Sequence, residues 1–194
     1  MIKAVIFDCF GVLATEGFDN FKNSYLKGSD TKLAQANKVM NELNIGQIDY
    51  DEFLKKLSAL AEVNQRVALD ALNKNKPNLP LFNYIRSQLK AKYKIGLLSN
   101  AGDNWLDEMF ASDDVALFDD IVLSYQHRMI KPDAPIFELA ARRLGVRPND
   151  CVFVDDKQKH ALGAEATGMK AIIYKGFPSF KAELEKILAP DSDN

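Results

Sequence analysis

Apolar residues recur along this chain with two different spacings. Short continuous apolar runs occur near the N-terminus and again from residue 94 onward, and such runs are typical of strands buried on both faces of a parallel sheet. Between residues 15 and 78 no such run occurs, and apolar residues recur at helical intervals of three and four. The pattern therefore predicts a domain of strands and helices that is interrupted by a helical insertion.

Strands and helices are predicted to alternate after the insertion. The first strand lies within residues 2–12, and further strands are predicted at residues 94–98, 120–123, 151–154 and 170–174. Helices are predicted at residues 81–90, 105–110, 135–144, 159–167 and 179–188. Such alternation predicts an α/β fold with a doubly wound parallel sheet. Residues 190–194 are expected to form a loose tail.

The insertion has the pattern of a small helical bundle. Its apolar positions at helical spacing are Leu33, Ala36, Met40, Leu43, Phe53, Leu57, Leu60, Val67, Ala71 and Leu72. Asp49, followed three residues later by Glu52, predicts a helix start. Two prolines within residues 76–80 predict a stiff connection back to the main domain. We therefore expect a core domain of residues 1–14 and 79–194 and a helical domain of residues 15–78, inserted over the carboxyl edge of the sheet.

Composition narrows the classes of function. A chain of 194 residues with 47% hydrophobic residues can bury a sizeable core. Its 25 basic and 27 acidic residues include no long basic cluster, which argues against nucleic acid as the main partner. No apolar run approaches the roughly 20 residues of a membrane span, and Met1 leads directly into the first strand, so we expect a cytoplasmic protein without a signal peptide. Cys9 and Cys151 have neither metal nor disulfide spacing and are expected to be free, buried thiols.

Polar side chains follow the predicted strands where each of them ends. They are Asp8 after the first strand, Ser99 and Asn100 after the second, and Asp155 and Asp156 after the strand at 151–154. A parallel sheet brings such ends together at one edge, and Lys131 can reach the same place from a loop. Clustered carboxylates repel one another unless a cation neutralises them, and oxygen ligands favour Mg²⁺. A lysine, a hydroxyl and an amide beside that ion would receive a phosphate. The alternative reading of Asp8 alone is a residue that caps the following turn.

Four segments resemble the ordered motifs of the haloacid dehalogenase superfamily. They are FDCFGVL around Asp8, LLSNAG around Ser99, MIKPDAPIF around Lys131, and VFVDDKQKHALGAEATGM. The resemblance covers essentially the whole chain. It includes the insertion, which is similar in position and size to the small helical cap of the family's first cap class.

The resemblance implies a covalent mechanism for phosphoryl transfer. Asp8 would attack phosphorus and form an aspartyl-phosphate that water then hydrolyses. Mg²⁺ would be held by Asp8, by the backbone carbonyl of Phe10 and by Asp156, with Asp155 binding the ion or a water on it. The family pattern also assigns phosphate contacts to Ser99 and Asn100, and assigns to Lys131 the balancing of the charge on nucleophile and phosphoryl group. The implied partner is a small phosphorylated metabolite, and the choice between monomer and homodimer stays open.

Two positions depart from the family pattern. Phosphatases of the family usually carry a second Asp two residues after the nucleophile, and here that residue is Phe10. His160 stands where the last motif usually has Asp or Asn, and we expect a structural or solvent-facing histidine rather than a titrating group of the site. Glu16 and Asp19, where the insertion begins, can swing over the site or simply face solvent.

Three functions are compatible with the sequence. The first is a Mg²⁺-dependent phosphatase whose activity is modest because the second acid is missing. The second is a 2-haloacid dehalogenase, because those relatives also have an aromatic residue at the position of Phe10, although they usually replace the acids of the last motif. The third is a protein that keeps the fold for phosphate binding or partner contact without catalysis.

Overall fold

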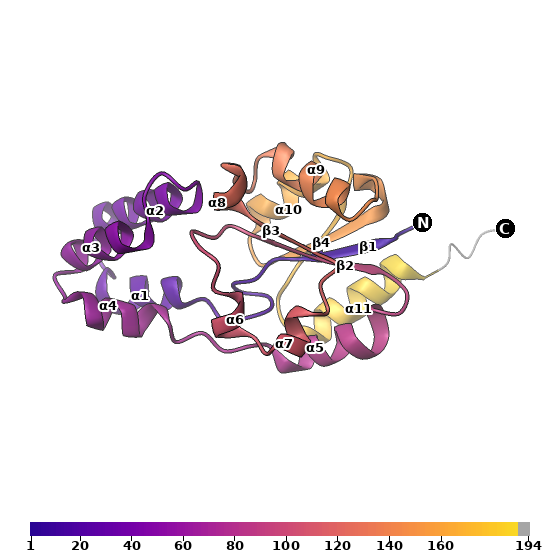
Figure 1. Cartoon of the computed structure of the whole chain (residues 1–194), viewed down its shortest axis with the longest axis horizontal. Coiled ribbons are helices and arrows are strands. Elements are labelled where there is room, and N and C mark those ends of the chain that lie inside the picture. The colour runs from indigo at the N-terminus through magenta and orange to yellow at the C-terminus, as the bar shows by residue number, and fades with distance from the viewer. Residues whose placement is uncertain (190–194) are drawn as a thin grey trace.

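The computed structural model describes residues 1–189, and within them a single parallel sheet forms the centre of the molecule (Figure 1). Its strands are β1 (Ala4–Phe7), β2 (Lys94–Ser99), β3 (Asp120–Leu123), β4 (Cys151–Asp155) and β5 (Lys170–Ile173). Their order is β3-β2-β1-β4-β5, and every neighbouring pair is parallel. The predicted α/β fold with a doubly wound parallel sheet is confirmed. The expected tail at 190–194 lies outside the described residues.

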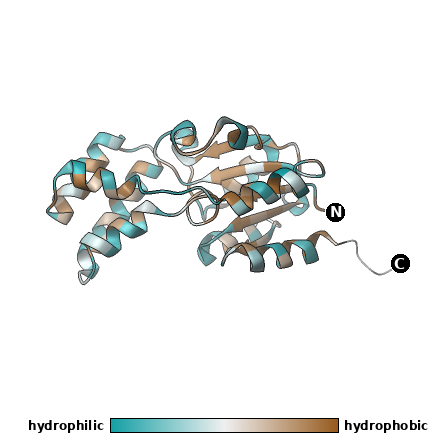
Figure 2. Ribbon diagram, turned by 90° about the horizontal axis from the view of Figure 1, so that it is seen from below, coloured by the Kyte–Doolittle hydropathy of each residue, from teal (hydrophilic) through white to brown (hydrophobic). Residues whose placement is uncertain are grey.

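Helices cover both faces of the sheet. Val5 and Phe7 of β1 pack into one apolar cluster with α5 (Leu79–Tyr84) and α11 (Phe177–Leu188), whereas Ala4 and Ile6 pack on the opposite face with α9 (Ala134–Arg143) and α10 (Gln158–Glu165). Figure 1 shows these two helix layers on either side of the strands, and Figure 2 shows the strands coloured as hydrophobic. The continuous apolar runs of the sequence exist because these strands are buried on both faces.

Four helices form the insertion: α1 (Gly17–Tyr25), α2 (Asp30–Asn44), α3 (Tyr50–Ala61) and α4 (Gln65–Leu72). They share an apolar cluster separate from the two that flank the sheet, and Figure 1 shows them to one side of it. The carboxylate of Asp49 accepts a hydrogen bond from the Glu52 N–H at 2.8 Å, which caps α3 as the sequence predicted. No helix within residues 1–189 is both long enough and apolar enough to cross a lipid bilayer.

The helical insertion contacts the core at the C-terminal end of α2. The buried Ser124 hydroxyl donates to the Asn44 carbonyl and accepts from the Ala101 N–H at 2.9 Å. Beside it, a Cβ at Gly102 would collide with the Leu43 side chain. Two long-range contacts therefore join the insertion to the core, one at Ser124 directly after β3 and one at Gly102 in the loop that follows β2.

The structure differs from the sequence-based elements mainly in its short helices. The helix predicted at 105–110 is the shorter α6 (Leu106–Met109), because Phe110 takes an extended conformation. The helix predicted at 81–90 begins earlier as α5 and continues as a π-helical turn, Ile85–Leu89. The single turns α7 (Ser112–Val115), α8 (Ser124–His127) and a 3₁₀ turn, Pro148–Asp150, were not predicted, because four or fewer residues cannot display a helical period.

Candidate active site

The ends of three strands meet at the carboxyl edge of the sheet. β1 lies between β2 and β4, with Phe7 level with Leu97 on one side and Val154 on the other. This register brings Asp8, directly after β1, beside the last residues of β2 and β4, which are Ser99 and Asp155. The predicted convergence of polar strand ends is therefore present in the geometry, as is common in open α/β sheets.

Lys131 reaches this edge from the loop before α9. Its ammonium Nζ lies 2.6 Å from Oδ1 of Asp8 and 2.8 Å from Oδ2 of Asp155, and it donates to the Leu98 carbonyl at 3.1 Å. The side chain of Lys131 has no exposed surface. Burial lowers the pKa of Lys131, but the charges of Asp155 and Asp8 outweigh that effect and raise it, so the side chain stays an ammonium.

The two carboxylates that share Lys131 differ in their proton affinity. Burial, followed by the charge of Asp155, raises the pKa of Asp8 to about 7 although Lys131 opposes this. Burial also acts to raise the pKa of Asp155, but Lys131 and His160 outweigh it and hold that pKa well below its usual range. One lysine thus does not neutralise the pair, and further positive charge near Asp8 would favour its ionised form.

Asp156 completes a cluster of three acids. Asp8, Asp155 and Asp156 each offer a carboxylate oxygen, and these oxygens lie within 4.8 Å of one another. Burial raises the pKa of Asp156, and its buried Oδ1 has no hydrogen-bond partner among the described residues. A cluster of hard oxygen donors with one buried, unpartnered oxygen fits a divalent cation such as Mg²⁺.

Gly11 lets the chain pass close to this cluster. Its φ is +91°, and a Cβ built there would lie 2.6 Å from Oδ2 of Asp156. Glycine is required on both counts, because the conformation is left-handed and the approach leaves no room for a methyl group. The turn after the predicted nucleophile therefore packs directly against the Asp156 carboxylate.

Ser99 and Asn100, the residues of the second family motif, have different surroundings. Ser99 is fully buried at the end of β2. The side-chain amide of Asn100 donates to the Lys131 carbonyl at 3.1 Å and accepts from the Lys131 N–H at 2.9 Å. Asn100 therefore fixes the backbone of the lysine loop, a task that the sequence did not indicate.

Phe10 and His160, the two departures from the family pattern, both pack against neighbours. The Phe10 ring packs against Trp105 in a tilted arrangement, with ring centroids 4.8 Å apart. His160 is buried rather than facing solvent, and its Nδ1 lies 3.0 Å from both carboxylate oxygens of Asp155. Burial lowers the pKa of His160, although the hydrogen bond and the charge of Asp155 act to raise it. Phe10 offers no side-chain proton to the site.

The cysteines and the first aromatic residues of the insertion pack in apolar interiors. Cys9 and Cys151 are free and buried, as predicted, and burial together with the charge of Asp8 raises the pKa of Cys9. The Cys9 thiol therefore stays protonated beside the acids.

Phe18 and Phe21 are buried within the helical insertion, and Tyr25, which is 38% exposed, packs against Phe21 in a tilted arrangement.

One ion pair near the acids was not expected from the sequence. Lys157, directly after Asp156, places its Nζ 2.9 Å from Oε1 of Glu16 at the start of the helical insertion. The sequence places Glu16 at the entry to the insertion and Lys157 beside the acids, but nothing in it pairs residues 141 positions apart. The pair is a second link between insertion and core.

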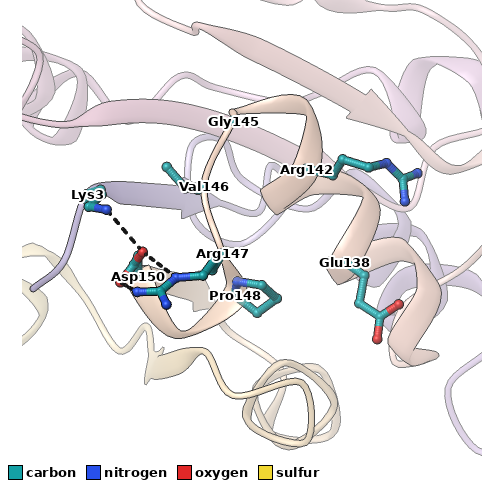
Figure 3. Close-up of a pocket in the computed structure, with 8 residues that line it drawn as sticks. All are labelled: Lys3, Glu138, Arg142, Gly145, Val146, Arg147, Pro148 and Asp150. Atoms are coloured by element: carbon teal, nitrogen blue, oxygen red, sulfur yellow. Dashed lines mark hydrogen bonds and ion pairs between the residues drawn. The ribbon is translucent and has the colours of Figure 1, made fainter.

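A separate surface groove of about 700 Å³ lies at the opposite, amino edge of the sheet (Figure 3). Asp150, one of the residues that line it, accepts from Lys3 at 3.3 Å and from Arg147 at 3.2 Å. Its carboxylate is thus already paired, and the groove lies at the wrong edge to take part in the site around Asp8.

A parallel α/β sheet with acids and a buried lysine at its carboxyl edge is the framework of an enzyme. The sequence profile of the haloacid dehalogenase-like hydrolases matches residues 2–168. The chain belongs to this family of hydrolases, as its motifs indicated.

Relatives and solved structures include more than one activity. YhcW of Bacillus subtilis (strain 168), provisionally named a phosphatase, is 26% identical over 185 residues, which are 89% of this chain and 83% of YhcW. The HAD family enzyme bt-2542 from Bacteroides thetaiotaomicron, solved with magnesium and inorganic phosphate, is 25% identical with a TM-score of 0.70 over 90% of this chain and 95% of its own. A 2-haloacid dehalogenase from Pseudomonas syringae pv. Tomato DC3000 shares the fold at 19% identity and a TM-score of 0.61, over 100% of this chain and 91% of its own.

Proposed function

We propose that this hydrolase is a Mg²⁺-dependent phosphatase that cleaves the phosphoric monoester of a small metabolite through an aspartyl-phosphate on Asp8. The observation that carries the proposal is the buried cluster of Asp8, Asp155 and Asp156 beside Lys131. The likeness to a relative solved with magnesium and inorganic phosphate supports it.

In this proposal Asp8 and Lys131 act on the phosphoryl group itself. A carboxylate oxygen of Asp8 attacks phosphorus, and the bond from phosphorus to the leaving-group oxygen breaks. Lys131, 2.6 Å from Asp8, stays charged and offsets the negative charge that nucleophile and phosphoryl group bring together. Ser99, at the same strand edge, would donate a hydrogen bond to the phosphate. Asn100 helps by holding the backbone of Lys131 in place.

The acids and one carbonyl would hold the metal. Asp8, Asp156 and the backbone carbonyl of Phe10 are the proposed ligands, with Asp155 oriented by Lys131 and His160 beside them. A bound Mg²⁺ supplies positive charge that lets Asp8 ionise and approach an anionic phosphate.

The helical insertion would cover the site as a cap. We take residues 15–78 as this cap, with residues 1–14 and 79–194 as the core. Its contacts through Ser124 and through Lys157 hold it next to the loops that carry Asn100 and Asp156. Side chains of the cap that face the core would then select the metabolite.

The aromatic residue at position 10 gives a second candidate, a 2-haloacid dehalogenase. The likeness to a haloacid dehalogenase structure at 19% identity speaks for a shared fold, not for this activity. Asp155 and Asp156 together favour the phosphatase, because halide displacement by a carboxylate needs no metal-binding acid pair.

One assay separates these readings. Hydrolysis of 4-nitrophenyl phosphate is measured with Mg²⁺ and with EDTA, for the wild type and for Asp8→Asn. We expect metal-dependent turnover that falls at least about 10³-fold in Asp8→Asn while the circular dichroism spectrum is unchanged. A folded protein that binds Mg²⁺ without turnover would indicate a binding protein, and release of halide from a 2-haloacid in EDTA would establish the dehalogenase.

A further inference from the structure

The proposed phosphatase lacks a proton donor at the position where the family pattern has one. The side chain of Phe10 carries no exchangeable proton, and it packs on Trp105 at 4.8 Å between centroids. An alkoxide is a poor leaving group unless an acid protonates it, and such an acid typically contributes about 10² to 10⁴-fold. A phosphatase of alkyl esters therefore needs another acid near Asp8.

The chain turns back immediately after Phe10. The Gly11 N–H donates to the Ala14 carbonyl at 2.7 Å, and the Ala14 N–H donates to the Cys9 carbonyl at 2.9 Å. This turn keeps residues 14–16 close to the end of β1. Ala14 forms a backbone bridge with Phe10, and Glu16, the residue before α1, follows two positions later.

A second contact fixes the Glu16 carboxyl from the other side. Lys157 donates from Nζ to Oε1 of Glu16 at 2.9 Å, and its backbone N–H donates to Oδ1 of Asp155 at 2.8 Å. The same lysine therefore joins the carboxyl of Glu16 to the loop that bears the acid cluster. The Glu16 side chain is only 15% exposed.

The surroundings of Glu16 suit proton exchange near neutral pH. Burial raises the pKa of Glu16 to about 7, although Lys157 opposes this, and the neighbouring Asp19 raises it further. Burial also acts to raise the pKa of Asp19, but hydrogen bonds with Lys22 and Glu16 outweigh it and lower that pKa. Lys157 and Asp19 are charged groups that act on this carboxyl, and Lys22 pairs with Asp19 at 2.6 Å. Of these two carboxyls, Glu16 therefore holds a proton more readily than Asp19 does.

We propose that Glu16 transfers the proton in this site, in place of the acid that is absent at position 10. The inference rests on the proposed phosphatase. In the first step a carboxylate oxygen of Asp8 forms its bond to phosphorus, the bond from phosphorus to the leaving-group oxygen breaks, and that oxygen takes the proton of Glu16. In the second step a water molecule gives a proton to the Glu16 carboxylate and its oxygen bonds to phosphorus, while the bond from the Asp8 oxygen to phosphorus breaks, which frees inorganic phosphate and restores the Asp8 carboxylate.

The test compares Glu16→Gln with two leaving groups. The ratio kcat/KM reports only the steps up to departure of the leaving group, so it isolates the first proton transfer. We expect Glu16→Gln to lower kcat/KM about 10²-fold for an alkyl phosphate, and less than about threefold for 4-nitrophenyl phosphate, whose leaving group needs no acid. An equal loss with both substrates would overturn the proposal.

The control is another carboxylate of the helical insertion that is paired with a lysine. Glu42 binds Lys56 at 3.1 Å and is 23% exposed, and Glu42→Gln should leave both ratios unchanged. Glu16 makes no side-chain capping bond to α1, so Glu16→Gln should fold, and its melting temperature checks this.

A second variant returns the acid to its usual position. In the Glu16→Gln background, Phe10→Asp should restore the alkyl phosphate ratio by at least about tenfold. No recovery in a folded double variant, together with an equal loss in the single variant, would show that Glu16 only holds the insertion in place. Both comparisons require a wild type that hydrolyses phosphate esters. A wild type without this activity would therefore refute the proposed function before the role of Glu16 is tested.

Discussion

The Nζ of Lys131 lies 2.6 Å from Oδ1 of Asp8, in a position without exposed surface. The same ammonium lies 2.8 Å from Asp155, so a single buried cation serves two carboxylates. Buried charges are tolerated only when they are paired, and here the pairing also orients the proposed nucleophile.

Removing this lysine should destabilise the protein strongly. Lys131→Met leaves Asp8 and Asp155 buried without their cation, and breaking such a buried pair typically costs about 3 to 5 kcal/mol. Urea unfolding in EDTA measures the change. Lys181→Met, in the exposed pair with Glu185 at 3.5 Å, is the control and should cost at most about 1 kcal/mol. Equal losses in the two variants would contradict this account of the buried pair.

A methyl group at Gly11 should disturb the acid cluster as well as the backbone. Gly11 and Gly28 have similar φ values, +91° and +94°, but only at Gly11 would the added methyl group lie 2.6 Å from the Asp156 carboxylate. Either change to alanine should cost about 1 to 3 kcal/mol through the backbone. Gly11→Ala should cost at least about 1 kcal/mol more and weaken Mg²⁺ binding, because Asp156 must move.

Thermal unfolding and calorimetric titration with Mg²⁺ measure the two effects. If Gly28→Ala weakens Mg²⁺ binding as much as Gly11→Ala, the collision with Asp156 is not the cause.

Loss of the Ser124 hydroxyl should loosen the contact between helical insertion and core. Ser124→Ala leaves the buried N–H of Ala101 and the carbonyl of Asn44 without their partner, at a cost of about 1 to 3 kcal/mol. Hydrogen exchange should rise at residues 43–46 before it rises in the sheet. Ser87→Ala removes an exposed hydroxyl that donates to the Asn83 carbonyl at 2.7 Å, and should leave exchange at 43–46 unchanged.

Asp119 should contribute stability that depends on pH. Burial acts to raise the pKa of Asp119, but hydrogen bonds from the Ile95 N–H and from Lys90 outweigh it and lower that pKa. Because the folded-state pKa lies below the unfolded-state value of about 3.9, the contribution is present above that value and is lost as pH falls through the folded-state pKa.

The variant Asp119→Asn tests this sign. It should be less stable than the wild type by about 1 kcal/mol at neutral pH, and the difference should shrink as the pH is lowered below the folded-state pKa. Melting curves over a pH series measure the difference, and a gap that widens in acid would refute the prediction.

The sheet and the acid cluster were predictable because their signals are local. The apolar run of β3, Asp120–Leu123, stands out in the sequence, and the carboxylates follow directly on such runs. A parallel sheet then brings the carboxyl ends of separate strands to one edge, independently of the conformation of the loops. Asp8, Asp155 and Asp156 could thus be grouped before the structure was known.

Contacts between distant loops gave no comparable signal. Ser124 opens a single helical turn too short to show a period, and its partner Asn44 lies 80 positions away. Lys157 and Glu16 are ordinary charged residues in the sequence, and only the fold pairs them. The departure at Phe10 was visible in the sequence, but the packing of its ring against Trp105 was not.

Trp105 is the chain's only tryptophan, and its ring rests on Phe10. The backbone of Phe10 belongs to the turn that contains the proposed metal ligand, while its side chain lies on the one strong fluorophore of the protein. The molecule therefore carries an intrinsic optical reporter within one residue of its proposed metal site. We therefore expect Mg²⁺ binding at that site to change the emission of Trp105, which can be measured without a label and without turnover.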